Sequence, residues 1–178
     1  PNVGKSAIFS RLTGTRVIAS NYPGTTVSFT RGYLSLRAER VEVIDVPGTY
    51  TLEPTSKAEE VAVDMLGDGD VIINVVDATN LERNLYLTIQ LLELGIPMVM
   101  ALNIHDEAEA KGYKINTKQM EETLGITVIP TSATRKIGLE QLLKAVVTLA
   151  DNLESHRPRI LNYGEDVETV LNSLNEYL

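Results

Sequence analysis

The sequence contains no cysteine and only two histidines, His105 and His156, among its 178 residues. The absence of cysteine excludes disulfides, thiolate nucleophiles and cysteine-ligated zinc or iron–sulfur sites, and it fits a reducing compartment. Two histidines are too few for a histidine-rich metal centre. We expect His105 to be an exposed loop residue and not a metal ligand.

Long apolar runs and an excess of basic residues are also missing. No apolar run approaches the ~18 residues that a membrane-spanning helix needs, and we expect no secretory signal peptide. Lysine and arginine number 16 against 24 acidic residues, which gives a formal net charge of −8. This charge argues against nucleic-acid binding, which needs a basic face. It does not exclude an anionic nucleotide, because a binding loop and Mg²⁺ can neutralise that charge locally.

The first six residues, Pro1-Asn2-Val3-Gly4-Lys5-Ser6, match the second half of the phosphate-binding motif G-x-x-x-x-G-K-[ST]. Gly4 allows the backbone to bend around a phosphate, and Lys5 can reach the β- and γ-phosphates. The Ser6 hydroxyl can ligate Mg²⁺. We therefore predict nucleotide binding by this loop, including the two residues that flank Gly-Lys-Ser, Val3 and Ala7.

A helix is predicted directly after this loop, because apolar residues recur at helical spacing at Ile8, Phe9 and Leu12, and Gly14 can end it. Its N-terminal dipole would assist anion binding. The first glycine of the motif would precede Pro1. We therefore expect that residue 1 is not the native N-terminus and that a strand lies upstream. Taken alone, Gly-Lys-Ser fits equally well a glycine turn before an ordinary helix.

Farther along, apolar periodicity and turn residues define the remaining elements. Residues 15–26 lack periodicity and predict a mobile loop, whereas residues 27–36 and 41–44 predict an antiparallel hairpin. Ser56 and Glu59 form a predicted capping box for a helix that ends at Gly67. Short buried strands then alternate with helices, as follows: strands at 71–76, 98–102 and 126–129, and helices at 81–94, 117–124 and 138–153.

This alternation predicts an α/β fold with a doubly wound, mainly parallel sheet, whose ligands bind at the carboxyl ends of the strands. Residues 1–153 would form that domain. Residues 154–163 resemble a linker, and residues 166–178 carry an apolar stripe at helical spacing. We expect residues 154–178 to contain the linker and the first helix of a second, helical domain.

Three polar clusters follow predicted strands. In Asp45-Val46-Pro47-Gly48, the carboxylate can hold Mg²⁺ through a water, and the Gly48 N–H can bind a γ-phosphate. In Asn103-Ile104-His105-Asp106, a fixed carboxylate can accept the N1–H and the amino group of guanine, which adenine does not offer. In Thr131-Ser132-Ala133, small side chains can let a backbone N–H reach guanine O6. Each cluster alone is equally typical of a strand-ending turn.

The order of these clusters, together with a threonine loop at Thr25-Thr26, resembles the five guanine-nucleotide motifs of the small GTPases. Longer stretches resemble the G domain of the ferrous iron transport protein B family. They are Asn21-Tyr22-Pro23-Gly24-Thr25-Thr26-Val27, Asp45-Val46-Pro47-Gly48-Thr49-Tyr50, Val76-Asp77-Ala78-Thr79-Asn80-Leu81-Glu82-Arg83-Asn84-Leu85 and Ala101-Leu102-Asn103-Ile104-His105-Asp106-Glu107-Ala108. The resemblance covers residues 1–153, and Tyr163-Gly164-Glu165 resembles the start of that family's helical spacer domain.

The resemblance implies roles for individual residues. Thr26 would coordinate Mg²⁺ with Ser6 and, through water, Asp45. Asn2 would bind K⁺, which could supply charge that an arginine finger supplies in other GTPases. The guanine base would be held by four residues: Asn103, Asp106, Ser132 and Ala133. The catalytic groups implied are Lys5, Thr26 and Gly48, and the cofactors are GTP or GDP, Mg²⁺ and K⁺.

The resemblance also implies a biological setting. This would be the cytoplasmic part of an inner-membrane protein whose own C-terminal polytopic domain, outside this sequence, carries Fe²⁺. Slow, K⁺-stimulated GTP hydrolysis would drive or gate iron uptake. Guanine nucleotide and that membrane domain are the expected partners, nucleic acid is not one, and a homo-oligomer is compatible with the sequence.

Two positions depart from the usual pattern. Ile104 replaces the lysine of N-K-x-D, which predicts weaker guanine affinity and faster release. Thr49 replaces the glutamine that orients water in Ras-like enzymes, which predicts slow hydrolysis. Two alternatives therefore stay open: a non-hydrolysing guanine-nucleotide switch that regulates the transporter, and a ribosome-assembly type GTPase. The second usually carries a basic RNA-binding appendage, against which the charge of −8 argues.

Overall fold

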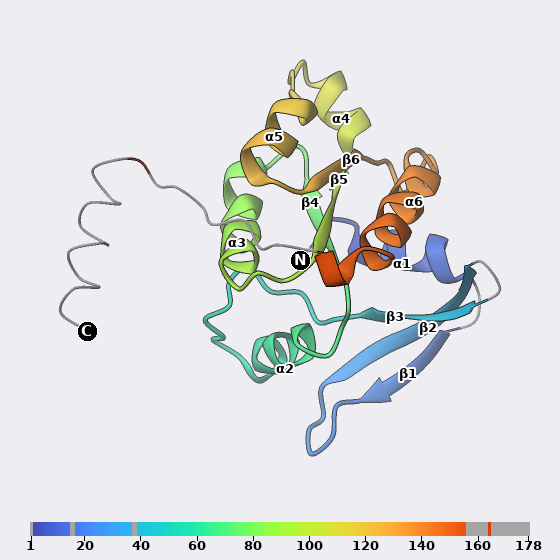
Figure 1. Ribbon diagram of the computed structural model, residues 1–178. Coiled ribbons are helices and arrows are strands. Elements are labelled where there is room, and N and C mark those ends of the chain that lie inside the picture. Colours follow the sequence, from blue (N-terminus) through green and yellow to red (C-terminus); the bar gives the residue numbers. More distant parts are fainter. Residues whose placement is uncertain (1, 15–16, 37–38, 156–163, 165–178) are drawn as a thin grey trace.

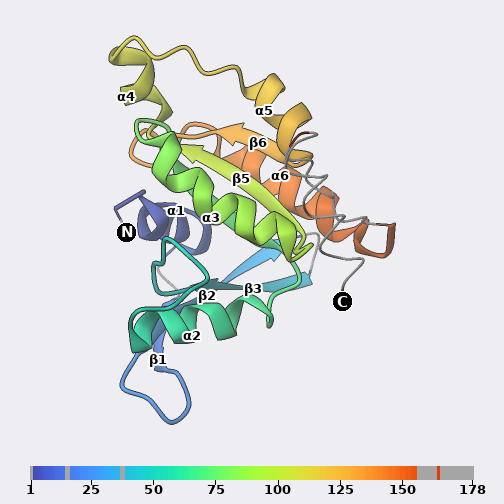
Figure 2. The same ribbon diagram turned by 90° about the vertical axis from the view of Figure 1, so that its left-hand side faces the viewer.

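The computed structural model describes residues 2–14, 17–36, 39–155 and 164, and two perpendicular views show its layers (Figures 1 and 2). Two three-stranded sheets are present in this described part. The antiparallel sheet has the order β1-β2-β3 and consists of β1 (Val17–Asn21), β2 (Ser28–Leu36) and β3 (Glu39–Asp45). The parallel sheet has the order β4-β5-β6 and consists of β4 (Ile72–Asp77), β5 (Met98–Asn103) and β6 (Thr127–Pro130).

Helices connect and cover these strands. They are α1 (Lys5–Thr13), α2 (Lys57–Leu66), α3 (Leu81–Glu93), α4 (His105–Ala110), α5 (Thr117–Leu124) and α6 (Leu139–Ala150), followed by the 3₁₀ turn η1 (Leu153–Ser155). The predicted hairpin and the predicted alternation of strand and helix are both confirmed.

Capping residues fix several helix ends where the sequence predicts them. The Ser56 hydroxyl accepts a hydrogen bond from the Glu59 N–H at 3.2 Å, and Gly14 follows α1 with a φ of 66°. The predicted capping box is only half formed. The Glu59 carboxylate accepts hydrogen bonds from the backbone and the hydroxyl of Thr55, one residue earlier than the reciprocal partner of a capping box.

The core lies on both faces of the parallel sheet. Every residue of β5 is buried, and its side chains alternate between two apolar clusters. One cluster packs α3 against the sheet and includes Leu91, Leu92, Met100 and Leu102. The other packs α1 and α6 against the opposite face and includes Ile8, Val99, Ala101 and Leu142. Figure 2 shows α3 and α6 on opposite sides of β5, so the doubly wound arrangement is confirmed.

The register of the parallel strands sets the position of the polar clusters. Asp77 pairs with Asn103 across β4 and β5, and Leu102 pairs with Pro130 across β5 and β6. The segments that follow β4, β5 and β6 therefore begin side by side at one edge of the sheet. This is the edge at which ligands bind in open α/β folds.

Residues 17–21 correct one expectation, because they form β1 and not a loop. Among the described residues this strand pairs only with β2, from Val17 opposite Gly32 to Asn21 opposite Ser28. Val17 and Ile18 are 45% and 54% exposed, so the strand has no buried face and no alternation that a sequence pattern could reveal. Pairing with a neighbouring strand determines this element.

Residues 105–110 correct a second expectation, because His105 begins α4 and does not lie in a loop. Its side chain is 20% exposed, and its Nδ1 lies 3.8 Å from Oε2 of Glu109. Helix α4 has six residues and buries only Ala108, so it carries no apolar stripe. Asp106 and Glu107 in its first turn favour its N-terminus electrostatically.

The predicted division of the chain at residue 153 stays a prediction. Most of the linker and all of the helix predicted over 166–178 lie outside the described residues.

Because β5 lies at the centre of the core, shortening one of its buried side chains should destabilise the fold. Leu102→Ala removes a side chain that is 0% exposed, so it should lower the free energy of unfolding by about 2–5 kcal/mol. Leu94→Ala is the matched control, because Leu94 is 59% exposed and its truncation should cost less than about 0.5 kcal/mol. Urea unfolding followed by circular dichroism measures both. Equal losses would contradict this assignment of the core.

Candidate functional site

The phosphate-loop residues lead directly into α1. Gly4 caps this helix with a φ of 81°, a left-handed conformation that favours glycine. A Cβ at this position would also collide with Nδ2 of Asn103. Ile8 and Phe9 are buried and anchor the helix. Lys5 and Ser6 are thereby held in the first turn, where backbone N–H groups have no partner within a helix.

Asp45 joins this first turn to the end of β3. Its carboxylate forms an ion pair with the Lys5 ammonium and accepts a hydrogen bond from the Ser6 hydroxyl at 2.9 Å. The Asp45 side chain is 12% exposed and that of Lys5 is 34% exposed. The structure thus brings together three residues that the sequence predicts for phosphate and Mg²⁺ binding. A hydroxyl beside a carboxylate fits Mg²⁺, which prefers oxygen ligands and keeps positions for water and phosphate.

Asn103, at the end of β5, connects the phosphate loop to the segment after β6. Its side-chain amide donates to the Val3 carbonyl at 2.9 Å. Its oxygen accepts from the Thr131 hydroxyl at 3.2 Å and from the Ala133 N–H at 3.1 Å. Asn103 is 2% exposed, so each of these groups would lose its partner in a dry environment if the amide were removed.

This bridging role is one that the sequence reasoning missed, since no motif spacing reveals it. With Ile104 at the position of the usual lysine, Asn103 itself makes a polar contact with the phosphate loop. The direct contact of Asn103 with a base stays a prediction, and one of its two N–H groups would serve for it.

Ile104 and Asp106 form the next part of the site. Ile104 has a φ of 59°, which is strained for a β-branched residue. It caps α4 and places Asp106 in the first turn of that helix. The Asp106 side chain is 15% exposed, and its Oδ2 lies 2.9 Å from Nε of Arg135. The sequence reasoning did not single out Arg135.

The turn over residues 132–137 is held at both ends. Ser132 and Ile137 exchange two backbone hydrogen bonds at 3.1 and 3.0 Å. Ala133 donates its N–H to Asn103, and its carbonyl accepts from Nε of Arg11 at 3.3 Å. Ser132 and Ala133 are buried, as small residues in a tight segment allow. The predicted contact of a backbone N–H here with guanine O6 would require Ala133 to share its N–H with Asn103.

The contacts described above do not include three further predicted site residues, Thr26, Gly48 and Asn2. Thr26 is exposed in the loop between β1 and β2, and within the described residues it has no hydrogen bond to Ser6 or Asp45. Gly48 is exposed after β3, and Asn2 is exposed with a φ of 65°. Their roles in Mg²⁺, γ-phosphate and K⁺ binding stay predictions.

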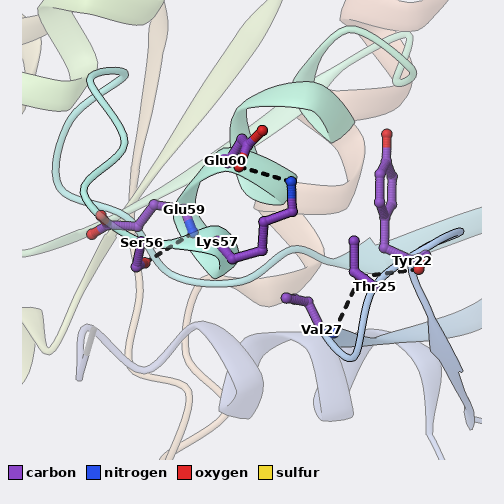
Figure 3. A network of polar contacts seen from close by, with 7 residues as sticks. All are labelled: Tyr22, Thr25, Val27, Ser56, Lys57, Glu59 and Glu60. Atoms are coloured by element: carbon purple, nitrogen blue, oxygen red, sulfur yellow. Dashed lines mark hydrogen bonds and ion pairs between the residues drawn. The ribbon is translucent and has the colours of Figure 1, made fainter.

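The loop that carries Thr26 packs beside α2, as Figure 3 shows. The Thr25 hydroxyl donates to the Tyr22 carbonyl at 3.0 Å and accepts from the Val27 N–H at 3.2 Å. Tyr22 and Val27 pack against an apolar cluster that includes Val61 and Met65 of α2. The loop and the helix are therefore one packed unit.

Charged groups at the start of α2 lie next to this loop. Lys57 and Glu60 form an ion pair at 2.8 Å, and the hydrogen bond from Lys57 to Glu60 raises the pKa of the lysine. Hydrogen bonds from the Thr55 hydroxyl and backbone lower the pKa of Glu59. Both groups thus keep their charges near neutral pH.

No group of three or more histidine or acidic side chains that could hold a metal ion occurs within the described residues, and no helix there is long and apolar enough to cross a bilayer.

Comparisons with known proteins point to one family. A family model described as "Ferrous iron transport protein B" matches residues 1–146. The Fe(2+) transporter FeoB of Escherichia coli K12 is 42% identical over 183 residues, which cover 97% of this chain and 24% of that protein. The Fe(2+) transport protein A/Fe(2+) transporter FeoB fusion protein of Porphyromonas gingivalis is 39% identical over 180 residues, covering 99% of this chain and 21% of its own length.

Solved structures give the same result. The cytosolic domain of T. maritima FeoB in its GMPPNP form has a TM-score of 0.89 and 38% identity, covering all of this chain and 71% of that one. The cytosolic domain of L. pneumophila FeoB has a TM-score of 0.86 and 37% identity, covering 99% of this chain and 77% of that one.

This chain spans about a quarter or less of the length of the curated relatives. The family model and both relatives cover most of its residues, and the neighbours share its G-domain fold. The chain therefore belongs to the ferrous iron transport protein B family and corresponds to the N-terminal G domain of that family.

Proposed function

We propose that this chain binds GTP and GDP with Mg²⁺ and hydrolyses GTP slowly, with stimulation by K⁺. The observation that carries this proposal is the hydrogen-bonded connection of the phosphate loop to the segments after β5 and β6 by Asn103. It joins a candidate phosphate-binding element to a candidate base-binding element at one sheet edge. Solved neighbours in GMPPNP and GDP forms support the same assignment.

The roles of the residues follow from their positions. Lys5 would neutralise phosphate charge, while Ser6 and Asp45 would hold Mg²⁺, Asp45 through a water. Bound Mg²⁺ would stabilise the charge that develops on the phosphate oxygens. Asp106 would accept the N1–H and the amino group of guanine, and the turn at Ser132 and Ala133 would enclose the rest of the base.

We expect slow hydrolysis because the Thr49 hydroxyl already forms hydrogen bonds within its own segment. This hydroxyl donates to the Thr51 carbonyl at 2.6 Å and accepts from the Thr51 N–H at 3.2 Å. These bonds leave it unsuited to hold an attacking water. Backbone groups would do so together with K⁺ at Asn2.

A non-hydrolysing guanine-nucleotide switch is the second candidate, and the same engagement of the Thr49 hydroxyl favours it. In either case the nucleotide would drive or gate Fe²⁺ uptake by a membrane domain of the same protein. The solved neighbours are cytosolic domains of FeoB, which supports a cytoplasmic location. A homo-oligomer stays a prediction.

The first prediction for this function concerns the monovalent cation. GTP turnover in Mg²⁺ should be at least about tenfold faster in KCl than in matched NaCl, since K⁺ would supply charge that an arginine finger supplies elsewhere. Asn2→Ala should abolish this difference and leave the rate in NaCl unchanged. Phosphate release by the intact protein measures both. Tight guanine binding without turnover in either salt would favour the switch instead.

A second prediction concerns Thr49. Thr49→Ala should change the turnover number by less than about tenfold, because we expect that the Thr49 hydroxyl does not position the water. Removal of a group that does position it would cost about 10²–10⁴-fold. A thousandfold loss in single-turnover assays would show that this hydroxyl positions the water after all.

A third prediction concerns base selection. Asp106→Asn should weaken GDP binding by about 10²–10⁴-fold. It should improve binding of xanthosine diphosphate, whose C2 carbonyl can accept from the new amide. Glu107→Gln is the matched control, because Glu107 is the neighbouring exposed carboxylate. Isothermal titration of each variant with GDP, ADP and xanthosine diphosphate gives the affinities. Equal binding of ADP by the unmodified protein would contradict the assignment of Asp106.

A further inference from the structure

The ion pair between Asp106 and Arg135 is not explained by guanine binding. Nε of Arg135 lies 2.9 Å from Oδ2 of Asp106, and the two side chains differ sharply in exposure, at 67% and 15% respectively. Asp106 belongs to the first turn of α4, whereas Arg135 belongs to the turn over residues 132–137. The carboxylate that would bind guanine thus already has a cationic partner from the opposite segment.

Guanine and Arg135 offer the Asp106 carboxylate the same arrangement of hydrogen-bond donors. Atom C2 of guanine bears three nitrogens, so its hydrogen-bonding edge is a planar guanidine unit with parallel N–H donors. Arginine presents its Nε–H and Nη–H in an equivalent fork, and a carboxylate accepts such a fork through two oxygens. Guanine is neutral whereas arginine is a cation. A carboxylate whose side chain is only 15% exposed can accommodate one such fork at a time.

We propose that Arg135 is an internal competitor for the base site, which occupies Asp106 until guanine displaces it. This inference rests on the proposed guanine-binding function. The turn that carries Arg135 is fixed by backbone bonds between Ser132 and Ile137 and by the hydrogen bonds of Ala133. The exposed arginine side chain can therefore leave for water while the backbone of the base site stays in place.

The expected reduction in nucleotide affinity depends on the fraction of molecules in which Arg135 contacts Asp106. If guanine binds only when Asp106 is free, its apparent affinity is the intrinsic affinity multiplied by the fraction of molecules in which Asp106 is free. An ion pair between a largely buried carboxylate and an exposed arginine should reduce that fraction about three- to tenfold. Because the competition precedes binding, it lowers the association rate and leaves the dissociation rate unchanged. High salt should weaken the competition.

The experiment compares Arg135→Gln with Lys136→Gln in the intact protein. Lys136 is exposed in the same turn, so each variant removes one positive charge near the nucleotide, but only the first removes the contact with Asp106. Stopped-flow binding of fluorescent GDP should show association about three- to tenfold faster in Arg135→Gln than in Lys136→Gln. The dissociation rates of the two variants should agree within about twofold, since the contact is absent once guanine is bound.

The outcomes separate this inference from the proposed function. Equal association rates in the two variants, or faster dissociation in Arg135→Gln, would overturn the competition. Failure of the unmodified protein to prefer GDP over ADP would refute the guanine site itself. A further control uses the Asp106→Asn background with xanthosine diphosphate, where Arg135→Gln should give no gain over Lys136→Gln. A gain that persists there would mean that Arg135 acts through another group.

Discussion

The buried amide of Asn103 is the constraint on which the arrangement of the site depends. One side chain satisfies the Val3 carbonyl, the Thr131 hydroxyl and the Ala133 N–H, which belong to segments far apart in the sequence. These groups lie at the edge of a sheet whose core surrounds β5, so water cannot readily replace the amide. The relative position of the phosphate loop and the base-site turn is therefore set by one residue at the end of the most buried strand.

Strand register explains why such a connection is possible. Asn103 pairs with Asp77 on one side, and Leu102 pairs with Pro130 on the other, so the chain leaves all three parallel strands at the same level. Gly4 then approaches this edge closely enough that no side chain fits between it and Asn103. The fold thus brings together groups that are about a hundred residues apart, and local polar contacts complete the arrangement.

Much of this was predictable from sequence, because apolar periodicity and capping residues report on local structure directly. The stripe at Ile8, Phe9 and Leu12 and the continuous apolar run of β5 needed no tertiary information. Strand β1 was not predictable, since it has no buried face and depends on pairing with β2. Residue spacing indicated the groups around Lys5 and Asp106 but not their partners, because the contacts of Asn103 and Arg135 depend on how distant segments meet.

The packing of the Thr26 loop against α2 has a mechanical consequence. Tyr22 and Val27, on either side of this loop, share one apolar cluster with Val61 and Met65, so displacement of the helix must shift the loop. Thermodynamic linkage makes such coupling reciprocal. Any ligand that orders the loop would therefore bias the position of α2, and any partner that presses on α2 would alter the affinity of the loop for that ligand. The surface of α2 is thus a point at which an external contact would change the position of this loop.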